Sequence, residues 1–157
     1  MLRLAFAVFF LSAPVSRADE DTSVKVEYTR HTGHFEKNNA GLKDEPSLLL
    51  IADQKRFDAI FGSAFTMGAK PNVVPNGAFE KKIVAAVIHR GNAVWTYEVE
   101  KVTVQGGTLT IRYKATEGKA STAKFASPLI VSVDKGAIKK VMFVENGKDI
   151  GSATPEK

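Results

Sequence analysis

Apolar and polar positions follow two distinct patterns in the middle of the chain. Ile83–His89 is an unbroken apolar run of strand length, which is typical of a central strand covered on both faces. Val94–Gln105 alternates instead, with Trp95 and Tyr97 on one face. The apolar phase then slips by one position, which predicts a β-bulge near Glu100–Lys101 that keeps the core face continuous.

A pair of glycines marks the turn after this strand. Gly106 and Gly107 can supply the positive φ angles that a tight hairpin turn requires. The next segment, Thr108–Ala115, alternates cleanly, and its inward positions are Leu109, Ile111 and Tyr113. The pattern therefore predicts an antiparallel hairpin with one face in solvent.

Weaker signals predict the remaining elements. They are a strand over Val24–His31, a strand over Pro46–Ile51, a helix over Gln54–Phe61 with Asp53 as N-cap and Gly62 as its stop, and a final pair of strands over Pro128–Asp134 and Ile138–Glu145. Thr32–Glu45, Ser63–Glu80 and Thr116–Ser127 are predicted connections, and Asn146–Lys157 a frayed tail. The sum is an α+β fold, in which one short helix packs on a mostly antiparallel curved sheet of six or seven strands.

The first eighteen residues predict a secretory signal peptide. Arg3 precedes the compact apolar block Leu4–Leu11, and Ser16–Ala18 offers the small residues that a signal peptidase reads, with cleavage after Ala18. The block is shorter than the roughly 20 residues of a membrane helix. We therefore expect residues 19–157 to form one globular domain, ordered over about 24–147, in the periplasm or the secreted fraction.

Composition narrows the classes of function. The chain has no cysteine, which excludes disulfides, thiolate metal sites, a thiol nucleophile and a cysteine-borne lipid anchor. Its net charge is +5, and removal of Arg3 and Arg17 with the predicted leader, which holds no acidic residue, leaves +3. The lysines are scattered and the aromatic residues occupy core positions, so the pattern does not favour nucleic-acid binding.

Five pieces of the chain between Leu49 and Glu145 carry a family resemblance. They read IADQKRFDAIF, FEKKIVAAVIHRG, WTYEVEKVTVQGGTLTIRYKA, SPLIVSVDKG and IKKVMFVENG. In this order they resemble the PrcB C-terminal domain family, named for a subunit associated with a secreted subtilisin-like protease. The resemblance implies the fold of that family and an accessory role toward an exported protein such as a protease.

One departure from the family pattern falls in the loop before the hairpin. The family carries a Thr-Gly-Gly-Tyr type of turn there, whereas this chain has the sequence GNAVWTY over Gly91–Tyr97. Gly91 and the aromatic residue are kept, but the paired glycines are not. If relatives contact a partner through this turn, we expect that contact to be lost or altered here.

The histidines offer one candidate chemistry. His31 and His34 lie close together at a predicted strand end, and with His89 or Glu36 they could complete a zinc or copper site. Their spacing matches no recognised metal signature, and the alternative is ordinary structural histidines. No serine lies in a Gly-x-Ser-x-Gly elbow. The prediction therefore includes no cofactor and no catalytic residue.

The loop around the only tryptophan offers a candidate docking surface. Interface hot spots favour Trp, Tyr and Arg, and this loop brings such residues together beside the Pro71–Ala78 connection. The predicted partner-binding residues are Arg90, Gly91, Asn92, Trp95 and Tyr97. The leading hypothesis is a non-catalytic exported domain that docks another exported protein. A histidine-based metal protein or small hydrolase and a small-ligand carrier are the alternatives, and the sequence does not define the oligomeric state.

Overall fold

The computed structural model describes residues 22–64 and 70–155. The predicted leader, residues 1–18, lies outside the described residues. Within them are one α-helix, α1 (Gln54–Ile60), and one 3₁₀ helix, η1 (Ala78–Glu80). The strands are β1 (Val24–Lys25), β2 (Thr29–His31), β3 (His34–Glu36), β4 (Ser47–Ile51), β5 (Phe61–Ser63), β6 (Lys82–Gly91), β7 (Trp95–Gln105), β8 (Thr108–Glu117), β9 (Phe125–Asp134), β10 (Lys140–Glu145) and β11 (Lys148–Ala153).

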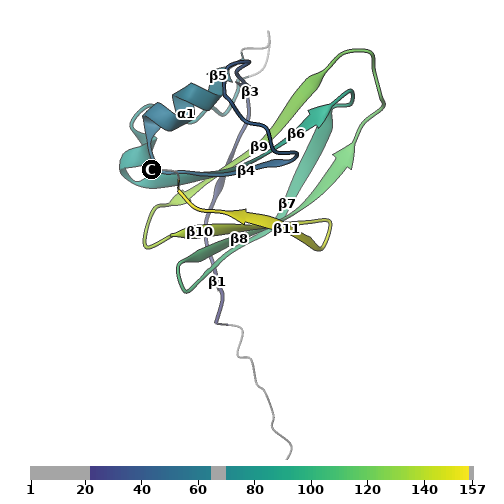
Figure 1. Ribbon diagram of the computed structural model, residues 1–157. Coiled ribbons are helices and arrows are strands. Elements are labelled where there is room, and N and C mark those ends of the chain that lie inside the picture. The colour runs from purple at the N-terminus through teal and green to yellow at the C-terminus, as the bar shows by residue number, and fades with distance from the viewer. Residues whose placement is uncertain (1–21, 65–69, 156–157) are drawn as a thin grey trace, which may run out of the picture.

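The strands form two main sheets and one small one. The larger sheet has the order β1-β7-β8-β10-β11, the second has the order β2-β9-β6-β4, and β3 pairs with β5 (Figure 1). Strands hold 54% of the described residues, so the sheet-dominated α+β class is confirmed. The expected count of six or seven strands is too low, and the expected single curved sheet is divided into these three.

Strand β6 separates the two hydrophobic cores. Ile83, Ala85 and Val87 belong to the cluster between the two main sheets, whereas Val84, Ala86 and Ile88 belong to the cluster under α1. Each of these six side chains is at most 1% exposed. Burial on both faces explains why this segment is an uninterrupted apolar run, and the prediction of a doubly covered strand is confirmed.

The β7–β8 hairpin also matches its prediction. The register shifts between Val99 and Lys101, which places the bulge where the apolar phase slips. Gly106 and Gly107 form the turn with φ angles of 55° and 80°. Both angles are positive, as a two-residue turn of this kind requires.

Helix α1 begins as predicted and ends for a different reason. Asp53 is its N-cap, and one carboxylate oxygen accepts a hydrogen bond from the Arg56 amide at 2.9 Å. The chain becomes extended at Phe61 and enters β5 directly, so Gly62 is a strand residue and not a helix stop. A Cβ atom on Gly62 would lie 2.4 Å from Cζ of Phe35, so glycine makes room there for that ring.

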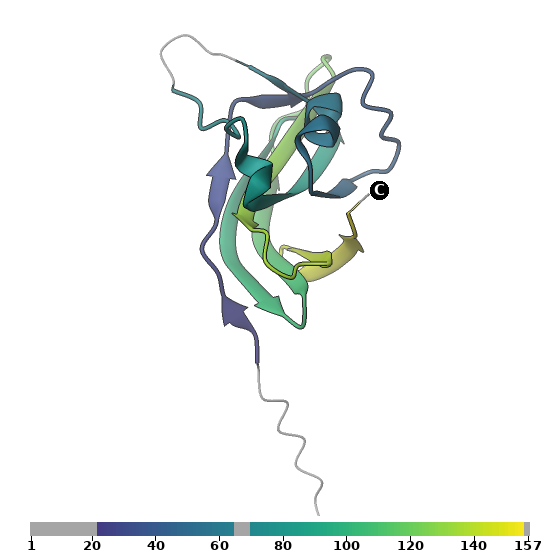
Figure 2. The ribbon, with the colours of Figure 1, turned by 90° about the vertical axis from the view of Figure 1, so that its left-hand side faces the viewer.

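The predicted first strand is divided between the two main sheets. β1 pairs with β7, and β2 pairs with β9, so the chain crosses from one sheet to the other between them (Figure 2). Val24 and Tyr28 are 64% and 39% exposed. The predicted continuous strand over Val24–His31 is therefore two short strands in different sheets. The predicted loop that follows contains β3.

The C-terminal part departs most from its prediction. β9 pairs with β2 and β6, whereas β10 crosses to the other sheet and pairs in parallel with β8, so the predicted final pair does not form. The expected frayed tail contains β11, which pairs with β10. Asn146 and Gly147 turn the chain between them with φ angles of 49° and 81°.

The two main sheets meet along β4 and β11. A Cβ atom on Gly151 would lie 2.9 Å from Leu48 Cδ1, and Pro155 bridges to Leu50. The N-terminal segment joins the sheets at the opposite edges through β1 and β2. The seven-residue helix α1 is too short to cross a bilayer, and the described residues contain no other α-helix.

The Asn146 side chain fixes the β10–β11 turn to β8. Its Oδ1 accepts from the Ala115 amide and its Nδ2 donates to the Ala115 carbonyl, both at 3.0 Å. Because each bond contributes about 1 kcal/mol, we expect Asn146→Ala to lower the free energy of unfolding by about 2 kcal/mol in urea titrations. Asn146→Gly removes the same bonds but accepts the positive φ freely. A glycine variant as stable as the unsubstituted chain would contradict this assignment.

Candidate functional site

The predicted docking residues diverge at the end of β6. Neighbouring residues of a strand point to opposite faces, so His89 turns toward the space between the sheets and Arg90 toward the side that carries α1. His89 accordingly contacts Trp95 of β7, whereas Arg90 pairs with Glu36 of β3. Arg90 and Trp95, which were expected to act on one surface, thus belong to two separate clusters.

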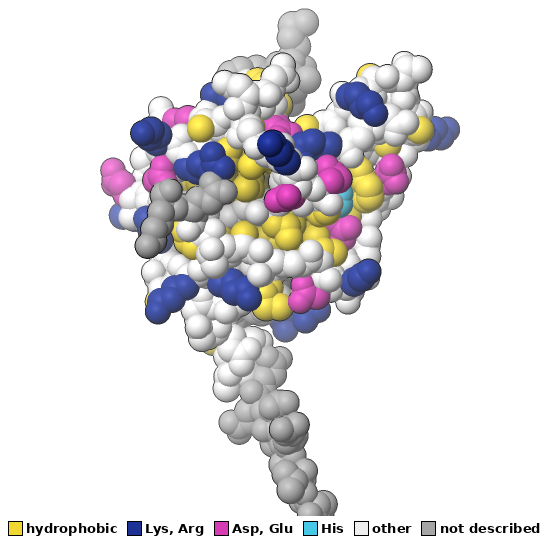
Figure 3. Space-filling view, in the orientation of Figure 1, with side chains coloured by type: hydrophobic (Ala, Val, Ile, Leu, Met, Phe, Trp, Pro, Cys, Tyr) yellow, Lys and Arg dark blue, Asp and Glu magenta, His cyan; other side chains and the backbone are white. Residues whose placement is uncertain are grey.

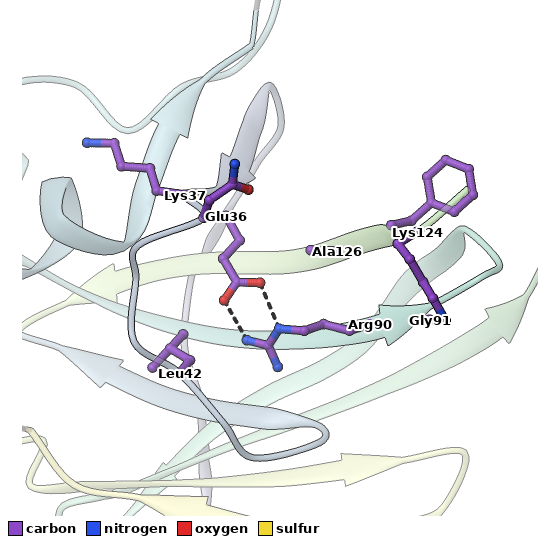
Figure 4. A pocket seen from close by; sticks show the side chains of 9 residues that line it. Glu36, Lys37, Leu42, Arg90, Gly91, Lys124 and Ala126 are labelled. Atoms are coloured by element: carbon purple, nitrogen blue, oxygen red, sulfur yellow. Dashed lines mark hydrogen bonds and ion pairs between the residues drawn. The ribbon is translucent and has the colours of Figure 1, made fainter. Parts of the chain in front are cut away.

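Arg90 is held by a fork of hydrogen bonds. Its Nε donates to Glu36 Oε2 at 2.8 Å and its Nη2 donates to Glu36 Oε1 at 2.6 Å (Figure 4). Nη1 donates to the Ser47 hydroxyl at 3.0 Å and to the Asp44 carbonyl at 2.9 Å. The hydrogen bonds that Arg90 donates to Glu36 raise the pKa of Arg90 above its usual value. Since all three guanidinium nitrogens are used inside the protein, Arg90 is a structural residue of the site and not a free anchor.

A groove lies beside this ion pair. It has a volume of about 430 Å³ and separates the region of β3 from the ends of β6 and β9. The space-filling view shows a hollow between the part that carries α1 and the projecting ends of β6 and β9 (Figure 3). Its lining residues are Glu36, Lys37, Asn38, Leu42, Arg90, Gly91, Lys124, Phe125 and Ala126.

The β6–β9 register builds one wall of the groove. Arg90 lies opposite Ala126, and Gly91 lies opposite Phe125. Gly91 has a φ of 154°, and no other atom lies within 4 Å of the position a Cβ would take. The backbone at Gly91 is therefore open, and a side chain there would be strained and would project into free space.

The groove carries an excess of positive charge. Lys37, Arg90 and Lys124 line it, against the single carboxylate of Glu36. Arg90 is already paired with Glu36 and lies 3.4 Å from Glu45 Oε2, and the Lys37 ammonium donates to the Asp58 carbonyl. The positive charge that remains in the groove is therefore that of the two lysines. Lys124 is exposed at the rim. An anionic group in the groove would meet this uncompensated charge.

His89 forms the second cluster, between the sheets. Its Nε2 lies 2.7 Å from Glu145 Oε2, which also accepts a hydrogen bond from the Tyr113 hydroxyl at 3.0 Å. Its Nδ1 lies 3.6 Å from Glu45 Oε1, and its ring stacks on Trp95 with centroids 4.3 Å apart. Both ring nitrogens face carboxylates, and the side chain is only 9% exposed.

The two tyrosines of this cluster are buried and hydrogen-bonded. Burial raises the pKa of Tyr113, and the negative charge of Glu145 raises it further. Burial likewise raises the pKa of Tyr97, whose hydroxyl donates to the Ser127 carbonyl at 2.6 Å. Trp95 is half-buried and packs against the core between the sheets. Of the five predicted docking residues, Arg90 and Gly91 line the groove, and Trp95 and Tyr97 do not.

The remaining predicted positions lie elsewhere. Asn92 is exposed in the loop after β6, and its carbonyl accepts from the Ser121 amide at 2.6 Å. The Pro71–Ala78 connection, expected to flank the docking loop, is fixed to the β2–β3 connection through Asn72 and Thr32, whose amide donates to the Asn72 carbonyl at 2.8 Å. It contributes no lining residue to the groove.

The three histidines are held in different hydrogen-bonding sets. His31 Nε2 lies 2.8 Å from the Ser132 hydroxyl, His34 Nε2 accepts from the Val74 amide at 3.0 Å, and His89 contacts Glu145. Residues 22–64 and 70–155 contain no group of three or more His, Cys, Asp or Glu side chains placed to hold a metal ion. The structure thus gives each imidazole a partner within the fold.

No family model matches this sequence, and no curated protein or solved structure matches it. The resemblance to the PrcB C-terminal domain family therefore stays an expectation from the sequence.

The Arg90–Glu36 fork predicts that the stability of the protein depends on a guanidinium group at position 90. Arg90→Lys keeps the charge but can make only one of the two parallel bonds, so we expect it to lower the free energy of unfolding by about 2 kcal/mol. Arg112→Lys is the matched control, because Arg112 is exposed on β8. We expect the control to stay within about 0.5 kcal/mol of the unsubstituted protein. Equal effects of the two substitutions in urea titrations would contradict a structural role for the fork.

Proposed function

We propose that this chain is a non-catalytic exported binding domain that docks an acidic, extended segment of another exported protein in the groove between β3 and the ends of β6 and β9. The observation that carries this proposal is the combination of a preformed groove, an uncompensated positive rim and an apolar wall at one place. Export rests on the predicted signal peptide, and the class of partner rests on the charge of the groove.

The floor of the groove is rigid before any partner arrives. Arg90 is fixed by Glu36, Ser47 and Asp44, so its side chain would lose little conformational freedom on binding. A surface that is already ordered binds more tightly for the same contact area, because less entropy is lost. Gly91 leaves its backbone open beside this floor, where an extended chain could approach closely.

The walls favour a segment with both acidic and apolar side chains. Leu42, Phe125 and Ala126 supply apolar surface, and Lys37 and Lys124 supply positive charge. Apolar contact provides most of the affinity in such a site, while complementary charge orients the partner and speeds association. An acidic segment with one apolar anchor fits this combination.

The contacts of His89 with two carboxylates support a structural role for this side chain. A general base needs a free nitrogen directed at the reacting group, whereas both nitrogens of His89 face Glu145 and Glu45. Leu109, Ile111 and Phe143 fill the centre of the space between the main sheets, which a small-ligand carrier would use. A cavity of about 320 Å³ lies at its edge, beside Val26, Val104 and Ile138. The contacts of His89 and the filled centre favour the groove as the functional surface.

Reversing the charge of the groove rim tests the proposal. Tagged mature protein would be used to capture partners from the exported fraction of the native host, and the captured protein would then be purified and titrated directly. We expect Lys124→Glu and Phe125→Ala each to weaken binding about tenfold or more, because they remove the charge and the apolar contact. We also expect rising salt to weaken binding of the unsubstituted protein.

The control reverses a charge away from the groove. Lys140 is exposed at the start of β10 and pairs with Thr108, beside the β7–β8 turn at the far end of that hairpin. Lys140→Glu should bind the partner as the unsubstituted protein does, with an unchanged melting temperature. A partner that tolerates Lys124→Glu and Phe125→Ala, or whose binding does not respond to salt, would overturn the groove as the docking site.

A further inference from the structure

The His31–His34 motif fastens a distant segment of the chain. The Thr32 amide donates to the Asn72 carbonyl at 2.8 Å, and the Asn72 amide donates to the Thr32 hydroxyl at 3.1 Å. Gly33 leaves the space for Pro71, since a Cβ atom there would lie 2.3 Å from Pro71 Cβ. The Val74 amide completes the attachment through His34. Thr32, Gly33 and His34 therefore hold the segment Pro71–Val74 against the β2–β3 connection.

The contact between Val74 and His34 defines the protonation state of His34. A backbone amide can only donate, so Nε2 of His34 must accept and carries no proton at a distance of 3.0 Å. The neutral ring therefore carries its proton on Nδ1, which is buried without a hydrogen-bond partner. Protonation of Nε2 would place two N–H groups against each other, and the bond to Val74 would be lost.

His31 differs from His34 in this respect. Its Nδ1 lies 3.2 Å from the Asn72 carbonyl and must donate, while its Nε2 lies 2.8 Å from the Ser132 hydroxyl. A hydroxyl can rotate to accept instead of donate. A proton added to His31 Nε2 is therefore compatible with the same contacts, whereas a proton added to His34 Nε2 is not.

The surroundings of His34 are mainly apolar. Its ring packs edge-on against Phe57 at 5.1 Å and lies 6.4 Å from the Phe61 ring centroid. Burial lowers the pKa of His34, the Gly62 backbone opposes this shift, and the charge of His31 adds to it. Burial also lowers the pKa of His31, the backbone of Asn72 and Val73 opposes this, and the charge of Lys82 adds to it. Lys82 is itself paired with Asp134 at 2.7 Å.

We infer that His34 is a pH-sensitive latch, whose protonation releases the segment Pro71–Val74 from the β2–β3 connection. Release would loosen one side of the apolar cluster under α1, because Val74 and Phe79 both belong to that cluster with Phe57 and Ile60. Acid would thereby expose apolar surface on the α1 side of the protein, independently of what occupies the groove.

The sign of the pH dependence follows from the direction of the shift. The folded chain binds a proton on His34 less readily than the unfolded chain, whose ordinary pKa is 6.5. The stability that neutral His34 gives to the folded chain is therefore fully present above that value. It is lost as the pH falls toward the lower pKa of His34 in the folded state. The loss falls in the mildly acidic range.

Amide hydrogen exchange of the full-length mature protein tests this inference. After correction for intrinsic exchange rates, we expect protection of the Val74 amide to fall about tenfold or more between about pH 7.5 and about pH 5. In His34→Gln the side chain can still accept from Val74 but cannot be protonated, so protection there should stay flat. In His31→Gln the fall should persist, which makes this variant the matched control.

Either of two measurements could overturn the latch. One is an equal fall in His34→Gln and in the unsubstituted protein. The second comes from ¹⁵N spectra of the His34 ring in the unsubstituted protein, which do not depend on a variant that folds. A ring that carries its proton on Nε2 at neutral pH, or that titrates without change at the Val74 amide, would contradict the inference.

Discussion

The burial of β6 on both faces is the constraint on which the rest of the structure depends. One set of its side chains requires the β7–β8 hairpin and β10 as cover, and the alternate set requires α1 and the segments around it. Each fully buried aliphatic side chain contributes about 1.5–3 kcal/mol, so neither cover can be removed without large loss of stability. At the end of the strand the same alternation sends His89 and Arg90 to opposite sides, which separates the inner cluster from the groove.

Local patterns in the sequence predicted the parts of the fold that local physics determines. The apolar run of β6, the bulge in β7, the glycine turn and the Asp53 cap each depend on residues a few positions apart, and each is confirmed. Pairing between distant strands was not predictable in this way. β10 pairs in parallel with β8 and does not pair with β9. β11 contains too few apolar residues for its sequence pattern to predict a strand.

In the candidate site, too, the sequence indicated individual residues but not their distant partners. Arg90 and Gly91 could be chosen from residue type and position, but their partners could not. Glu36 is 54 residues away from Arg90 in the chain, and it lies in a segment whose polar composition predicted a loop. The Arg90 guanidinium is already hydrogen-bonded to Glu36. The polar groups that remain for a ligand therefore come from residues such as Lys124, which belong to no recognisable sequence motif.

The groove beside the Arg90–Glu36 pair is the proposed docking surface. Site-specific photo-crosslinking tests it most directly, with a photoreactive amino acid at Asn38, which lines the groove, and at Lys140, which lies near the far turn. In the native exported fraction the account predicts one discrete covalent adduct from Asn38 and none from Lys140. An adduct from Lys140 alone, or the same adducts from both positions, would contradict it.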